Sequence, residues 1–180
     1  EGIIRDSAMF ILRGSGVSCE TDFKEELWLV DIDPGQMSQV IQNIIINARE
    51  AMPDGGNIFI STQSRYIDRP IRGYDDVEEG DDVILKKSDT GVGISSGDME
   101  RIFEPFYTKK VMGRSGTGLG MAVVWGTVKD HKGYIDVQST KGKGTTFTLY
   151  FPVTRKEIAG REEALSMEEY MGKGEFILVV

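Results

Sequence analysis

The chain has 180 residues, enough for one domain with a substantial core and too few for two comfortable ones. Its 28% of charged and 39% of hydrophobic residues exclude a disordered or fibrous protein. A net charge of -8 opposes binding to the phosphate backbone of nucleic acids, so we expect no nucleic-acid partner.

The first third of the chain is predicted to alternate helices with short strands. Apolar residues recur at a helical period in the opening segment, and two short apolar or alternating runs follow it. Asp33 is a good N-cap and Pro34 suits the first helical position, so together they predict the start of a long helix. The predicted elements are helices over 3–13 and 34–52 and strands over 17–23, 27–33 and 57–66.

The middle of the chain is predicted to end in an antiparallel hairpin. An acidic loop over 73–82 is interpreted as a solvated surface connection. A glycine-rich segment leads into a helix that ends at Gly133, and a Lys-Gly-Lys-Gly turn joins the last two strands. Interleaved helices and strands predict an α+β two-layer sandwich, one sheet covered by helices. The elements predicted here are strands over 81–89, 134–140 and 144–151 and a helix that follows the glycines of 116–120 and ends at Gly133.

The two ends of the chain indicate a piece of a larger protein. We expect one domain over residues 1–153, a polar linker over 154–173 and, in the apolar run 174–180, the truncated first strand of a next domain. The chain also begins at Glu1 without a methionine. We expect the isolated domain to be monomeric.

The composition of reactive side chains limits the chemistry. Cys19 is the only cysteine and His131 the only histidine, which excludes a zinc cluster, an internal disulfide and a Cys-His or Ser-His pair within this chain. This cysteine usage fits a reducing, cytoplasmic location. No apolar run approaches the roughly 20 residues of a membrane helix, so we expect no membrane contact by this fragment.

A polar stripe runs along the helix predicted over 34–52. Asn43, Asn47 and Glu50 are four and three residues apart and fall on one edge of the helix, beside an apolar arc that would pack on the sheet. Carboxamide oxygens can ligate a hard cation such as Mg²⁺. The spacing alone favours a solvated helix edge over a metal site.

Two glycine clusters flank a segment rich in aromatic and basic residues. Asp89 follows a strand and could accept a hydrogen bond from an exocyclic amine, while Gly91 and Gly93 would let the backbone turn against a flat ligand. A plain turn would have the same pattern. Gly116, Gly118 and Gly120 precede a helix and could face phosphates, although they form neither a Walker A loop nor a dinucleotide fingerprint. The segment between the clusters suits either a mobile lid or a surface loop; it contains Phe103, Phe106, Tyr107, Lys109, Lys110 and Arg114.

Together these segments resemble the ATP-binding catalytic domain of sensor histidine kinases, within the wider gyrase, Hsp90 and MutL ATPase superfamily. Four ordered boxes carry the resemblance, and the end of the domain matches as well. It covers about residues 1–153 and implies a Bergerat-type sandwich, with a mixed sheet of about five strands covered on one face by about three helices. The matching segments are QVIQNIIINAREAMPDGG (N box), DTGVGI (first glycine box), IFEPFYTKK (F box), GTGLGMAVV (second glycine box) and HKGYIDVQSTKGKGTTFTLYFP.

The resemblance implies a site for ATP with Mg²⁺. Asp89 would bond the adenine amino group, Gly91, Gly93 and Ile94 would shape the pocket floor, and Thr145 would touch the base. On the helix, Asn47 would coordinate the Mg²⁺, Asn43 would support the phosphates and Glu50 would lie nearby. The lid would be pinned by Phe103 and Phe106 and would carry Thr108, Lys109 and Lys110, and the phosphates would be wrapped by Gly116, Thr117, Gly118, Leu119 and Gly120.

Two positions depart from the family pattern. Many histidine kinases carry a lysine where this chain has Glu50, so neutralisation of phosphate there is in doubt. Lys87 shares an alternation position with Val83 and Leu85, where an apolar side chain is expected. Because an unpaired buried ammonium is costly, Lys87 must reach solvent, find a carboxylate or mark a distortion.

Three functions stay open from the sequence. The first is transfer of the γ-phosphate of ATP to a histidine on a separate dimerisation domain of the same parent, because His131 lies at a predicted helix end and suits capping. The second is ATP hydrolysis, which Asn43 disfavours since relatives of the gyrase kind have a general-base glutamate there. The third is a nucleotide-sensing docking module without transfer. The run 174–180 resembles the opening strand of a receiver domain, which implies a hybrid kinase with a receiver domain or response regulator as a further partner.

Overall fold

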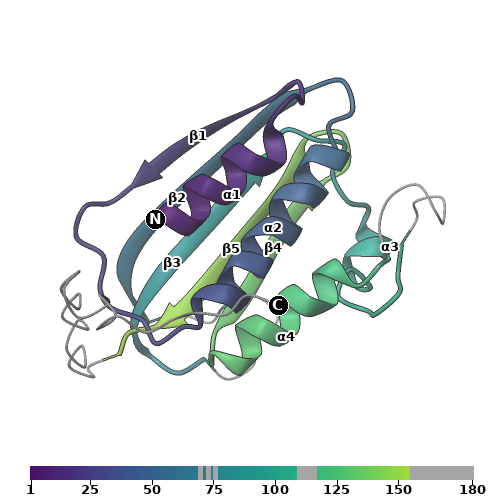
Figure 1. Ribbon diagram of the computed structural model, residues 1–180. Coiled ribbons are helices and arrows are strands. Elements are labelled where there is room, and N and C mark those ends of the chain that lie inside the picture. The colour runs from purple at the N-terminus through teal and green to yellow at the C-terminus, as the bar shows by residue number, and fades with distance from the viewer. Residues whose placement is uncertain (69–70, 72–73, 75–76, 109–116, 155–180) are drawn as a thin grey trace, which may run out of the picture.

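The computed structural model describes residues 1–68, 71, 74, 77–108 and 117–154 (Figure 1). Within these residues the chain forms one five-stranded sheet and a layer of helices. The predicted linker over 154–173, apart from Thr154, and the predicted strand over 174–180 lie outside the described residues. The elements are α1 (Gly2–Leu12), β1 (Val17–Phe23), α2 (Pro34–Glu50), β2 (Gly56–Ile67), β3 (Gly80–Asp89), α3 (Ser96–Met99), α4 (Gly120–Asp130), β4 (Tyr134–Thr140) and β5 (Gly144–Pro152).

The sheet is mixed, with strand order β1-β2-β3-β5-β4. β1 pairs with β2 in parallel, and the other three pairs are antiparallel. α1, α2 and α4 lie side by side over one face of the sheet, with α2 in the centre (Figure 1). This arrangement confirms the predicted α+β sandwich with about five strands and about three covering helices.

The central helix α2 forms where its capping residues predict. The Asp33 carboxylate accepts a hydrogen bond from the Gln36 N–H at 2.7 Å, and Pro34 occupies the first turn. The apolar arc predicted for this helix faces the sheet, and burying each of these side chains contributes roughly 1.5–3 kcal/mol. The buried residues of the arc are Val40, Ile41, Ile44, Ile45 and Ala48, followed by Met52 just past the helix.

The strand predicted over 27–33 is wrong. This segment joins β1 to α2 and makes only one isolated bridge, between Val30 and Val153. Trp28 and Leu29 are 43% and 47% exposed, while Val30 and Ile32 pack against the core as partly buried side chains. A strand needs a backbone neighbour along its length, whereas this segment meets separate residues of different parts of the chain: Ser64 of β2, and Val153 and Thr154 just past β5.

The loop between β2 and β3 is more than the predicted solvated connection. Among its described residues, Ile71 is buried, and Tyr74 and Val77 pack with it against the uncovered face of the sheet. The Tyr74 hydroxyl accepts a hydrogen bond from the Ile135 N–H at 3.0 Å, which satisfies a backbone donor of the edge strand β4. The Tyr74 ring also stacks on Trp125 of α4. The loop therefore closes one edge of the sheet.

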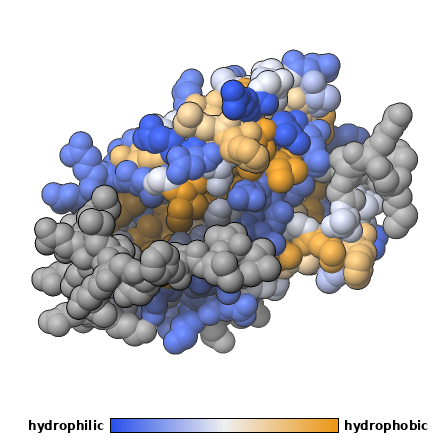
Figure 2. Space-filling model, viewed as in Figure 1, coloured by the Kyte–Doolittle hydropathy of each residue, from blue (hydrophilic) through white to orange (hydrophobic). Residues whose placement is uncertain are grey.

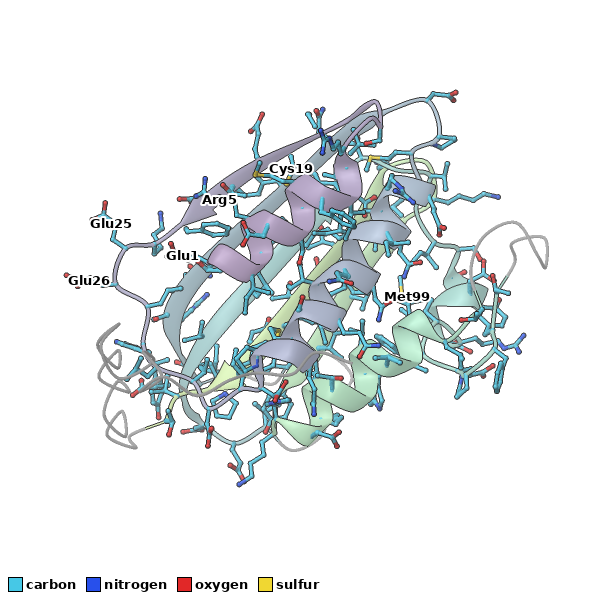
Figure 3. The ribbon with its side chains drawn as sticks, in the orientation of Figure 1. Glu1, Arg5, Cys19, Glu25, Glu26 and Met99 are labelled. Carbon is cyan, nitrogen blue, oxygen red and sulfur yellow. The ribbon has the colours of Figure 1, made fainter. Side chains whose placement is uncertain are left out.

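The surface of the helix-covered side is mostly polar, with an apolar patch over α1 (Figure 2). On this helix Met9 and Phe10 are 70% and 83% exposed. A groove of about 720 Å³ lies between α1 and β1, where Arg5 and Cys19 are found (Figure 3). It shares no lining residue with the predicted nucleotide site.

Candidate nucleotide-binding site

The polar stripe of α2 meets the N-terminus of α4. Asn43, Asn47 and Glu50 are partly exposed along one edge of α2. A Cβ atom placed on Gly120, the first residue of α4, would lie 3.1 Å from the Asn43 Oδ1. The N box and the second glycine box are therefore in contact, and the free N–H groups at the start of α4 lie beside a carboxamide.

Asp89 is buried at the end of β3 and binds backbone from two other segments. Its Oδ1 accepts hydrogen bonds from the Gly91 N–H at 3.0 Å and from the Thr145 N–H at 3.2 Å. The structure thus brings together the first glycine box and the last hairpin. Sequence reasoning predicted these three residues for one site.

The two predicted glycines of this box allow close backbone approaches. Gly93 has φ 67°, and a Cβ there would collide with the carbonyl oxygen of Thr140. A Cβ on Gly91 would lie 2.8 Å from the Ala51 Cβ, at the end of α2. The box is consequently wedged between α2 and the turn that joins β4 and β5.

A chain of hydroxyl groups links Ile94 to Thr145, and sequence reasoning missed its middle member. The Ile94 N–H donates to the Ser139 Oγ at 2.8 Å, and the Ser139 and Thr145 hydroxyls are 2.9 Å apart. Ser139 and Thr145 face each other in the β4–β5 register. The hairpin pattern in the sequence could have identified this pair.

Lys87 finds a carboxylate, the second of the three outcomes that its position allows. Its Nζ lies 2.7 Å from the Asp89 Oδ2, and the two side chains are only 5% and 3% exposed. The ring of Phe147 lies 5.0 Å from the ammonium. Burial lowers the pKa of Lys87, and the charge of Asp89 opposes this effect.

The F box is held to α4 by one of its two predicted phenylalanines. Phe103 packs on Trp125 with ring centroids 5.0 Å apart. The anchoring role predicted for Phe106 is wrong for this conformation, because this residue is 70% exposed and has φ 66°. Its N–H instead donates to the Gly118 carbonyl at 3.0 Å, so the backbone joins the F box to the second glycine box.

The other predicted lid and phosphate-loop residues are placed in part. Thr108 is half-buried and Thr117 exposed, and the Leu119 N–H lies 3.4 Å from the Thr117 Oγ1. Leu119 is the N-cap of α4 and Gly120 its first residue, so the helix follows the glycine-rich segment as predicted. Lys109, Lys110 and Gly116 lie outside the described residues.

His131 caps helices rather than facing the site. Its Nε2 accepts a hydrogen bond from the Asp33 N–H at 3.0 Å, and its Nδ1 lies 2.8 Å from the Thr127 carbonyl. Nδ1 therefore carries the proton, and both ring nitrogens are engaged. This geometry supports the predicted capping role.

The fold and the converging boxes define a nucleotide-binding domain, and comparisons with known proteins give its family. The sequence model of the family described as "Histidine kinase-, DNA gyrase B-, and HSP90-like ATPase" matches residues 32–155. The chain belongs to this family. Within it, the chain matches the catalytic domains of sensor histidine kinases.

The similar proteins are consistent with this assignment. The sensor kinase CckA of Brucella abortus is 40% identical over 153 residues, which are 83% of this chain and 16% of that protein. Sporulation kinase E of Bacillus subtilis is 37% identical over 139 residues, 77% of this chain and 17% of that protein. A solved catalytic domain of the histidine kinase ThkA is 25% identical with a TM-score of 0.66, covering 85% of this chain and 91% of that one.

The chain spans about a sixth of the length of these two curated kinases. A full-length ShkA structure in complex with AMPPNP is 23% identical, has a TM-score of 0.65 and shares the fold over 85% of this chain and 30% of that one. In the part of the chain that the structure describes, none of the helices is both long and apolar enough to cross a membrane.

Proposed function

We propose that this domain binds ATP with Mg²⁺ and donates the γ-phosphate to a histidine on a separate dimerisation domain of its parent protein. The observation that carries the proposal is the convergence of Asn43, Gly120 and the Asp89 network in a chain of the histidine kinase ATPase family. We also propose that transfer takes place in the cytoplasm and that the phosphoryl group passes on to a receiver domain or response regulator.

The base end of the proposed site is the Asp89 network. A carboxylate there accepts a hydrogen bond from the exocyclic amine of adenine, and the close backbone approaches at Gly91 and Gly93 hold this box against α2 and the β4–β5 turn. Thr145 and Ile94 complete this end through the Ser139 hydroxyl.

The phosphate end lies between α2 and the start of α4. Mg²⁺ in nucleotide sites is held by one or two protein oxygens, by phosphates and by waters, so the Asn47 carboxamide suits this ion. Among the described residues no group of three or more His, Cys, Asp or Glu side chains could hold a metal. The N-terminus of α4 supplies N–H donors and a positive dipole end for the phosphates, beside Asn43.

Glu50 adds a negative charge to this end of the site, where many relatives have a lysine. In the proposed complex the Mg²⁺ compensates this charge. Lys109 and Lys110, which lie outside the described residues, are proposed from the family resemblance to supply further positive charge for the phosphates. Their role is to stabilise charge on the phosphoryl group during transfer.

The acceptor is placed on a partner because His131 is occupied in capping. The test supplies labelled ATP together with the separately purified histidine-bearing dimerisation domain of the parent. Label on the histidine is the expected result. Release of free phosphate alone would indicate a hydrolase, and neither product would indicate a docking module; both outcomes contradict the proposal.

A variant on α2 tests the metal assignment in the same assay. Asn47→Ala is expected to reduce transfer by at least about tenfold, the loss typical of a disturbed metal site. Gln42→Ala is the matched control, because Gln42 is exposed on the same helix and hydrogen-bonds only within it, to Ser38. Equal transfer by the two variants would remove Asn47 from the metal site.

A further inference from the structure

The Asp89 carboxylate has one acceptor position left. A carboxylate offers about four lone-pair positions, two on each oxygen. Oδ1 accepts from the Gly91 and Thr145 N–H groups, and Oδ2 accepts from the Lys87 ammonium. A single position on Oδ2 therefore remains for a ligand.

Within the described part of the chain, Asp89 is the one anion that Lys87 contacts. Its side chain is 5% exposed, and the small space beside it is lined by apolar residues of α2, β2, β3 and β5. Among the described residues that pack there, Asp89 is the only charged partner of the ammonium. The lining side chains are Ile41, Ile44, Ile45, Ile60, Leu85, Phe147 and Leu149.

The ammonium decides whether Asp89 accepts or donates. A carboxyl group in an apolar setting favours its protonated form unless a nearby cation stabilises the charge. A protonated carboxyl is a donor as well as an acceptor. It could then bind the 6-oxo group of hypoxanthine or guanine as well as the 6-amino group of adenine.

We propose that Lys87 is a specificity-determining positioning residue, which keeps Asp89 an acceptor-only carboxylate with one open position and so favours 6-aminopurines over 6-oxopurines. This inference rests on the proposed function, because it takes Asp89 as the group that contacts the base. Lys87 itself acts through Asp89 from beneath the pocket.

The test compares ATP with inosine triphosphate, whose base has a 6-oxo group and an N1–H where adenine has a 6-amino group and an unprotonated N1. Their affinities for wild type, Lys87→Met and Lys86→Met are measured by calorimetry at pH 5.5 and pH 8 with Mg²⁺. Both nucleotides carry the same triphosphate, so the effect of phosphate protonation on affinity is the same for each and drops out of the ratio of their affinities. Lys86→Met is the matched control, since Lys86 is exposed on the opposite face of β3.

The expected result is a pH-dependent loss of discrimination in Lys87→Met alone. Without the ammonium the Asp89 carboxyl lacks its cation among apolar neighbours, a setting that favours the neutral form, so at pH 5.5 the ratio falls about tenfold or more below the wild-type ratio. At pH 8 the ratio returns toward the wild-type value. Wild type and Lys86→Met keep one ratio at both pH values.

Several results would overturn the inference. One is an unchanged ratio in Lys87→Met at both pH values, and another is a loss of equal size at both, which a merely structural role would produce. A wild-type ratio that itself falls tenfold between pH 8 and pH 5.5 overturns it without any variant. By contrast, two results remove the proposed base contact itself. One is a wild type that binds no ATP, and the other is a Lys87→Met/Asp89→Asn double variant that at pH 8 discriminates as well as Lys87→Met.

Discussion

Breaking the buried pair from the acidic side should cost a large share of the stability of the domain. In Asp89→Asn the Lys87 ammonium stays buried without its partner, which typically costs about 3–5 kcal/mol. The asparagine cannot repair the site, because its single amide oxygen can serve either the two backbone N–H groups or the ammonium. Since domains are stable by only about 5–15 kcal/mol, this loss is readily measured.

The same reasoning predicts that removing both charges restores stability. Lys87→Met places an unbranched apolar chain among apolar neighbours, while Asp89 keeps its two backbone hydrogen bonds. We expect the Lys87→Met/Asp89→Asn variant to be more stable than Asp89→Asn alone, with a coupling energy between the two substitutions of about 0.5–3 kcal/mol, the usual size for residues in contact.

The double-mutant cycle is measured by urea unfolding of wild type, both single variants and the double variant. Lys86→Met is the surface control. The midpoint and the slope of each curve give the free energy of unfolding. A double variant no more stable than Asp89→Asn would refute the reasoning, and so would an Asp89→Asn variant within about 1 kcal/mol of wild type.

Three further predictions concern other parts of the domain. Gly93→Ala should weaken ATP binding at least tenfold in calorimetry, since its Cβ would collide with the Thr140 carbonyl at φ 67°, whereas Gly97→Ala, with open space around it, should bind normally. Burial raises the pKa of Asp82 to about 6, so the folded state binds this proton more tightly than the unfolded state does. The stability that this proton contributes is lost as pH rises from about 4 to 6. In urea unfolding, Asp82→Asn should therefore be more stable than wild type by about 1–3 kcal/mol at pH 8 and similar to it at pH 4. His131→Ala should lose about 1 kcal/mol of stability with its two hydrogen bonds but still support labelling of the partner domain; loss of labelling with the fold intact would contradict its capping role.

Local signals predicted most of the fold. The Asp33-Pro34 start of α2 and the glycine-bounded strands depend on residues close in sequence, and the structure has them within a few residues of the predicted bounds. The strand expected over 27–33 failed because an apolar run carries no information about a partner strand. The short helix α3 was not predicted, since four residues give no period to detect.

The site residues within one short sequence motif were predictable from the sequence. The residues whose role depends on the pairing of two strands were less predictable. Asp89 and its glycines stand out in the sequence, but the role of Ser139 depends on its register opposite Thr145. Tyr74 lies in an acidic loop whose charge suggests solvent, yet its ring and hydroxyl bind α4 and β4. Side chains of this kind are identified only by what lies across from them in space.

Lys87 changes how a substitution at Asp89 must be interpreted in this chain. In a domain with an apolar residue at that position, removing the aspartate charge mainly tests contact with the base. Here the same change also leaves the Lys87 ammonium buried without its partner. Weaker ATP binding by Asp89→Asn would therefore combine the loss of the base contact with a loss of folded protein. The base contact is measured cleanly only against Lys87→Met, where the acidic partner can be removed without leaving a buried charge.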